Sequence, residues 1–131
     1  MLVKRKSVYE NVLDIPEGKD GEFAIQHVRH PAGHKFNLVT GRTMLMAGHT
    51  GAAIDYDHET RWHLLKEGDG IWMSDYPIEQ IQHDKLLKPI RSGRVLIGGL
   101  GLGYATSVLA SRPGIKSVVA VDHSTKVIRL V

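Results

Sequence analysis

The chain has 131 residues, the length of one domain or of one small domain with part of another. Hydrophobic residues make up 42% and charged residues 24%, as in globular proteins, which excludes a disordered or fibrous chain. The formal net charge of +3 comes from scattered basic residues, so the sequence does not indicate a nucleic-acid partner. Because the chain has no cysteine, disulfides, thiolate metal sites and thiol nucleophiles are excluded.

The sequence does not predict a targeting or membrane-spanning segment. No apolar run approaches the roughly 20 residues that cross a bilayer. The basic cluster Lys4–Lys6 is not followed by an apolar stretch, so the N-terminus does not resemble a signal peptide. We therefore expect no membrane partner and a cytoplasmic location.

Residues 1–75 predict a small, mostly antiparallel β region. Short extended segments alternate here with turn residues, which is typical of antiparallel sheets. Gly48–Gly51 has the length and composition of a hairpin loop, and Gly68–Gly70 marks a further turn. The expected strands are Glu22–Val28, Lys35–Thr40, Arg42–Ala47, Ala53–Asp57 and Ile71–Met73.

Three histidines in this region, His27, His30 and His34, have the spacing of one helix face. Pro31 and Gly33 exclude a helix between them, so the spacing does not bring the three rings together. We interpret them as solvated loop residues. The sequence predicts no metal site.

A helix is predicted from Pro77 to Leu87. Proline suits the first helical turn, where its missing N–H would have had no partner. Glu79 favours the same end because its charge complements the positive end of the helix dipole. Asp75 or Tyr76 is then the expected capping residue.

The candidate catalytic or substrate-side residues are Asp75, Tyr76 and His83, because this helix leads into the strand that precedes a glycine loop. Ser74 and Asp75 beside His83 also leave nucleophilic catalysis open. A helix cap is the favoured interpretation, since Ser, Asp and Pro are the residues expected at a helix start. Three aromatic residues are expected in the core or along a cofactor cleft: Tyr56, Trp62 and Trp72.

The last third of the chain predicts a β-α-β unit. Two apolar runs have the character of parallel strands that are buried on both faces. Strand, glycine loop, helix, strand, acid and helix is the order found in nucleotide-binding α/β units. The expected elements are the strands Val95–Gly98 and Ser117–Val121, the helix Tyr104–Ser111 and a helix that begins at Thr125 with Ser124 as its cap.

The loop Gly98–Gly103 and the acid Asp122 suit a nucleoside ligand. Glycine permits unusual backbone angles and lets a ligand approach the main chain, and the following helix presents free N–H groups to the same point. Asp122 lies 19 residues after Gly103. This is close to the roughly 20 residues expected for an acid at the tip of the next strand, which can accept hydrogen bonds from both ribose hydroxyls.

The glycine spacing excludes a dinucleotide fingerprint, which requires small residues at relative positions 0, 2 and 5. Registers that begin at Gly99 or Gly101 would place the third small residue at Tyr104 or Thr106. The pattern that fits is an alternate series, Gly99, Gly101 and Gly103.

This series resembles motif I of the class I S-adenosylmethionine-dependent methyltransferases and their spermidine-synthase-like relatives. Val118–Ser124 resembles the second strand of these families with its ribose-binding acid, and the whole resemblance covers roughly residues 70–131. The cofactor-binding residues that it implies are Gly99, Gly101 and Gly103 for the methionine and ribose side of S-adenosylmethionine, Asp122 for the ribose hydroxyls, and His123 near the adenine.

We therefore expect an α+β chain, with the β region over residues 1–75 and a linking helix and incomplete Rossmann-like unit over 76–131. Ile97 stands where many methyltransferases carry an acid, and the chain ends at Val131 before the remaining strands and the aminopropyltransferases' catalytic loop, which indicates truncation. The expected function is S-adenosylmethionine-dependent transfer to an unidentified acceptor, with methyl favoured over aminopropyl. The alternative is a non-catalytic cofactor-binding fragment that a second copy or another chain completes.

Overall fold

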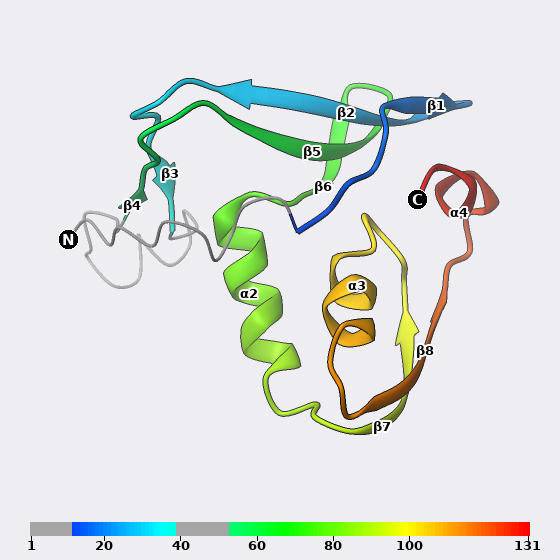
Figure 1. The fold of residues 1–131 in the computed structure, drawn as a ribbon. Helices are drawn as coiled ribbons and strands as arrows, with labels where there is room; N and C mark the ends of the chain where they lie inside the picture. The colour runs from blue at the N-terminus through cyan, green and yellow to red at the C-terminus, as the bar shows by residue number, and fades with distance from the viewer. Residues whose placement is uncertain (1–11, 39–52) are drawn as a thin grey trace, which may run out of the picture.

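The computed structural model describes residues 12–38 and 53–131, which form a mixed α/β fold (Figure 1). Its elements, in chain order, are β1 (Gly18–Asp20), β2 (Phe23–His30), β3 (Phe36–Asn37), β4 (Ala53–Ile54), β5 (Thr60–Glu67), β6 (Gly70–Ser74), α2 (Pro77–Leu87), β7 (Gly93–Gly98), α3 (Tyr104–Ala110), β8 (Ile115–Val121) and α4 (Thr125–Leu130). Figure 1 shows a β-sheet at one end of the molecule and the β7–α3–β8 segment extending away from it. No helix in these two ranges is both long and apolar enough to cross a bilayer.

The larger sheet has the strand order β1-β2-β5-β6, and every pairing in it is antiparallel, as the sequence predicts. The β2–β5 ladder runs from Phe23 opposite Glu67 to His30 opposite Thr60. β3 and β4 form a separate antiparallel pair. These strands are shorter than the expected Lys35–Thr40 and Ala53–Asp57. The expected strand Arg42–Ala47 and the expected hairpin loop Gly48–Gly51 lie outside the described residues.

Strand β5 is the main element that the sequence analysis missed. Polar residues such as Arg61 and His63 interrupt its apolar residues, so it shows no clear alternation. In the structure Trp62, His63, Leu64 and Leu65 are all buried. A polar residue can occupy such a strand because His63 is hydrogen-bonded to Asp75, a residue 12 positions further along the chain.

Helix α2 has the predicted bounds, and Tyr76 occupies its N-cap position without a side-chain capping bond. The first turn is held by Glu79, whose Oε1 accepts hydrogen bonds from the backbone N–H and the hydroxyl of Ser74 at 3.0 and 2.7 Å. The hydroxyl of Ser74 also accepts the N–H of Tyr76 at 3.2 Å. Of the two expected capping residues, Tyr76 has the N-cap position and Asp75 does not, while the side chains of Ser74 and Glu79 make the hydrogen bonds at the helix start.

The elements expected in the last third of the chain are present, within two residues at each end. The expectation that both strands are buried on both faces is wrong, because Leu96, Val119 and Val121 are more than half exposed. β7 and β8 are parallel and paired from Arg94 opposite Ser117 to Gly98 opposite Val121, with α3 between them in the chain. The hydroxyl of Ser124 accepts the N–H of Val127 at 3.3 Å, which confirms Ser124 as the cap of α4.

One hydrophobic core joins the β region to this α/β segment. Its buried residues come from the segment before β1, from β2 and β5, from the glycine loop, and from α3 and α4: Leu13, Ile15, Ile25, Leu65, Leu102, Tyr104 and Val127. A second cluster, largely aromatic, includes Trp62 and Tyr56. The division into units at residue 75 stays a prediction, since the first core crosses it.

Candidate functional site

A cleft of about 550 Å³ lies between the larger sheet and the glycine loop. Its walls come from β2, β5, β6 and α2, and from the glycine loop and the segment Asp122–Val127, which includes the start of α4. The lining residues are Phe23, Leu65, Glu67, Trp72, Met73, Glu79, His83, Gly99, Gly101, Asp122, His123, Ser124 and Val127. Four of the five residues that the sequence assigns to the cofactor thus meet in one cleft.

Asp122 connects the glycine loop to the segment between β8 and α4. Its Oδ2 accepts the backbone N–H of Leu100 at 2.9 Å, and its Oδ1 accepts that of Ser124 at 2.9 Å. The parallel pairing of Gly98 with Val121 accounts for this proximity, because both strands end at the same edge of the sheet. A carboxylate has about four acceptor positions, and the backbone N–H of Gly101 also interacts with this one, so only part of its acceptor capacity remains for a ligand.

The pKa of Asp122 lies below its usual range, because the N–H groups of Ser124 and Leu100 donate to the carboxylate. A group whose pKa is lower in the folded than in the unfolded state stabilises the fold above its ordinary pKa. That contribution is lost as the pH falls through the folded-state value.

We therefore expect the difference in unfolding free energy between the wild type and Asp122→Asn to narrow as the pH falls from about 5 to 3. Asparagine keeps one acceptor oxygen but carries no charge, so it removes the titration while preserving the shape. Urea unfolding at several pH values measures the difference. A difference that does not change with pH would contradict this role of Asp122.

Gly99 leaves open space beside the main chain. Its φ is +92°, in the region that disfavours side chains, and a Cβ built on it would meet no atom within 4 Å beyond its chain neighbours. Its N–H donates to the carbonyl of Val121 at 2.7 Å, which fixes the loop against β8. A ligand could therefore contact the backbone at Gly99 without displacing protein atoms.

Gly101 and Gly103 have different surroundings. A Cβ on Gly101 would lie 2.6 Å from the sulfur of Met73, which also accepts the N–H of Leu102 at 3.3 Å. Gly103 is the N-cap of α3 and does not line the cleft, and a Cβ there would lie 3.1 Å from Val131. Both glycines make room for protein packing, and Gly99 alone of the three leaves space for a ligand.

We expect Gly101→Ala to destabilise the fold by about 1–3 kcal/mol, because the new methyl group would displace Met73. The control is Gly68→Ala, whose φ of +55° matches the +54° of Gly101 but whose Cβ would meet nothing within 4 Å. Chemical denaturation should give a larger cost for Gly101→Ala, and a smaller one in a Met73→Ala background. Equal costs at the two glycines would show that backbone strain alone matters.

The three candidate catalytic residues do not lie together. His83 lines the cleft, and its Nδ1 is 2.8 Å from the carbonyl oxygen of Glu79. Asp75 is only 4% exposed and bonds to His63, while the hydroxyl of Tyr76 lies 2.9 Å from Nε2 of His30. Neither Asp75 nor Tyr76 lines the cleft, so only His83 remains a candidate there.

The other aromatic residues and histidines singled out from the sequence lie in different parts of the structure. Trp62 and Tyr56 are in the core, whereas Trp72 is 66% exposed and lines the cleft. The rings of His30 and His34 stack at 4.0 Å, while His27 bonds to the carbonyl of Ile15. Within residues 12–38 and 53–131, no three His, Cys, Asp or Glu side chains are grouped to hold a metal ion.

Glu67 and Met73 are among the cleft residues that were not identified from the sequence. Glu67 ends β5, the strand that showed no pattern, and its Oε2 accepts the indole N–H of Trp72 at 2.6 Å. Alternation along β6 could have placed Met73 on the face opposite Trp72, but not against the glycine loop.

Comparisons with family models, curated proteins and solved structures found no match to this chain.

Proposed function

We propose that the cleft binds S-adenosylmethionine and that the chain is an S-adenosylmethionine-dependent transferase with a Rossmann-like cofactor unit. The observation that carries this proposal is the meeting of Asp122 and the open backbone of Gly99 at the carboxyl ends of two parallel strands. In open α/β sheets, ligands bind outside these strand ends.

The cleft residues fit the cofactor group by group. The acceptor capacity left on Asp122 suits ribose hydroxyls, and the space at Gly99 suits close contact between ligand and backbone. His123 is almost fully exposed at the rim, with its side chain 97% accessible, where it can lie against an adenine ring. Trp72 offers a further apolar surface on the opposite wall.

The bound cofactor would supply the electrophilic methyl group, and the protein would supply orientation. Transfer from a sulfonium depends on in-line placement of the acceptor, which can provide much of the rate. Asp122 and the glycine loop would hold the nucleoside at one end of the cleft. Glu67, Trp72 and His83, which do not belong to the glycine loop, would then face the acceptor.

Aminopropyl transfer is the second candidate, and the charges of the cleft favour it. The lining residues include the carboxylates Glu67, Glu79 and Asp122, and among the described lining residues none is Lys or Arg. Such a cleft attracts a cationic acceptor, and Trp72 can add a cation–π contact. The donor for this reaction would be decarboxylated S-adenosylmethionine, because S-adenosylmethionine itself would transfer a group that keeps its carboxylate. A diamine that binds in the presence of the decarboxylated donor would favour this reaction over methyl transfer to a neutral acceptor.

Calorimetric titration with S-adenosylmethionine, S-adenosylhomocysteine, NAD and ATP tests the proposal. We expect the first two to bind most tightly and Asp122→Ala to weaken them by about tenfold or more, because two hydrogen bonds to ribose are lost. Asp69→Ala, in the exposed turn before β6, is the control and should bind normally. Preferential binding of NAD would reject the proposal.

Thermal unfolding of the same variants separates binding from folding. Asp122 also accepts two backbone N–H groups, so its replacement by alanine should lower stability as well. Asp122→Asn retains part of this bonding, and at temperatures where it is fully folded it should bind the cofactor more weakly than the wild type does. An unchanged affinity in a folded Asp122→Asn variant would mean that the carboxylate serves the loop and not the ligand.

A further inference from the structure

Helix α4 begins directly after the cleft residues Asp122–Ser124 and packs against β1 and β2. Val127 is 4% exposed and belongs to the shared core, while the hydroxyl of Ser124 caps the helix. A helix of six residues is marginal alone, so its position depends on what it packs against. Because Ser124 caps α4 and Asp122 lies two residues before this cap, a displacement of α4 would disturb the segment Asp122–Ser124.

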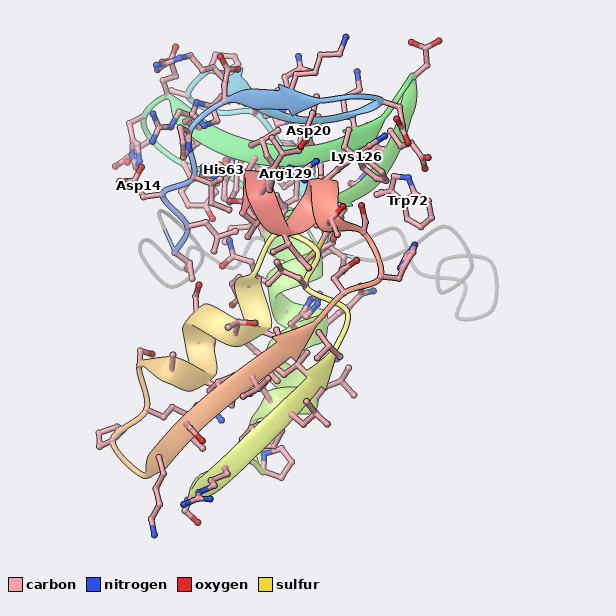
Figure 2. The ribbon with its side chains drawn as sticks, turned by 90° about the vertical axis from the view of Figure 1, so that its right-hand side faces the viewer. Asp14, Asp20, His63, Trp72, Lys126 and Arg129 are labelled. Atoms are coloured by element: carbon pink, nitrogen blue, oxygen red, sulfur yellow. The ribbon has the colours of Figure 1, made fainter. Side chains whose placement is uncertain are left out.

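Two ion pairs attach α4 to the β1–β2 hairpin (Figure 2). Nε of Arg129 lies 2.6 Å from Oδ2 of Asp20, and Nζ of Lys126 lies 2.7 Å from Oε2 of Glu22. Their hydrogen bonds lower the pKa of both acids, Asp20 chiefly through Arg129 and Glu22 chiefly through Lys126. Both acids are ionised at neutral pH, as exposed carboxylates ordinarily are, so both pairs are charged there.

Glycines permit α4 to approach closely from two sides. A Cβ on Gly21, in the hairpin, would lie 2.7 Å from Nζ of Lys126, and one on Gly18 would lie 3.3 Å from Leu130. On the other side, a Cβ on Gly103 would lie 3.1 Å from Val131, which directly follows the helix. The C-terminal segment is therefore seated between the hairpin and the glycine loop.

We propose that Asp20 and Glu22 are positioning residues for the cofactor site, because they hold α4, and through it Asp122, in place by salt-dependent ion pairs. This inference rests on the proposed function. None of the four charged residues lines the cleft, so they would act only through the helix. Each exposed pair is weak alone, but both act on the same short helix.

Charge reversal and its rescue test the proposal. One variant carries Asp20→Lys and Glu22→Lys, a second carries Lys126→Glu and Arg129→Glu, and a third combines all four changes. We expect each double reversal to weaken S-adenosylhomocysteine binding by about threefold to tenfold at low salt, and the fourfold variant to recover most of it. The losses should shrink near 1 M NaCl, where the Debye length falls to about 3 Å and the attraction and repulsion between these charges are partly screened.

A matched control is Glu59→Lys, which breaks the exposed pair between Arg29 of β2 and Glu59, the residue before β5. It should leave affinity unchanged at every salt concentration. Normal affinity in the hairpin reversal, or no recovery in the fourfold variant, would overturn the inference, since steric damage by the new side chains would neither depend on salt nor be rescued by exchanged charges.

Hydrogen exchange separates this inference from the proposed function. The N–H of Ile128 donates to the carbonyl of Ser124 at 3.1 Å, so its protection reports on α4 without any ligand. If the wild type does not bind S-adenosylhomocysteine, the proposed function is rejected. The attachment of α4 then stands if Ile128 loses protection in both reversals and regains it in the fourfold variant, and falls if its protection is unchanged.

Discussion

Replacing Asp75 with alanine is expected to lower the free energy of unfolding by about 3 kcal/mol or more. Both oxygens of this carboxylate bond to His63, one to its backbone N–H at 2.6 Å and one to its Nδ1 at 2.7 Å. The side chains of His63 and Asp75 are only 3% and 5% exposed. Without Asp75, water could not readily replace the lost acceptor at either donor.

The hydrogen-bond pattern of His63 extends this effect to the segment before β1. The N–H of Ile15 donates to Nε2 of His63 at 3.4 Å, which places the ring hydrogen on Nδ1, facing Asp75. A ring freed from Asp75 would lose this orientation. Ile15 belongs to the core that includes Leu102 of the glycine loop. Weaker packing of Ile15 would therefore also affect the packing of the loop that lines the cleft.

Urea unfolding of Asp75→Ala measures this cost. The control is Asp14→Ala, because the side chain of Asp14 is 98% exposed and lies 3.7 Å from Arg61. We expect the control to change stability by less than about 0.5 kcal/mol. A similar small effect for Asp75→Ala would show that the buried pair does not stabilise this fold.

The second large effect is expected for Gly99→Leu, which should abolish detectable cofactor binding, a loss of roughly 100-fold or more in affinity. A Cβ at Gly99 enters space that is free of protein atoms, so a leucine side chain would occupy the room proposed for the ligand. Titration with S-adenosylhomocysteine measures the loss.

Gly93→Leu is a close control for backbone strain. Gly93 has a φ of +96°, against +92° for Gly99, and a Cβ there would also meet nothing within 4 Å. It begins β7, whereas Gly99 directly follows the end of the same strand. Both variants should lose similar stability, and only Gly99→Leu should lose binding. Equal affinities in the two variants would contradict a close approach of ligand to the glycine loop.

The second half of the fold was predictable because its signals are local. Pro77 marks the start of α2, Ser124 caps α4, and two apolar runs give β7 and β8. The sequence also predicted that Asp122 would lie beside the glycine loop, since parallel strands end at one edge. The hydrogen bonds of Asp122 to Leu100 and Ser124 were not predicted, because they depend on the geometry of both loops.

The β region was less predictable because its burial depends on tertiary contacts. Nothing near His63 in the sequence indicates that its partner is Asp75, so β5 lacked an apolar pattern and Asp75 was assigned to capping or substrate. The space beside Gly101 is likewise limited by Met73, which lies in β6, far from Gly101 in the sequence. Glycine spacing alone could not distinguish packing from ligand contact.

The most direct test of a cofactor site in this cleft is a ¹H–¹⁵N NMR titration of the wild type with S-adenosylhomocysteine. We expect the largest saturable shifts at the amides of Gly99, Gly101 and His123, which line the cleft, and little change at Gly114, which lies at the opposite end of the β7–β8 pair. Saturable shifts centred on Gly114, or no shifts in the cleft at millimolar ligand, would contradict the account.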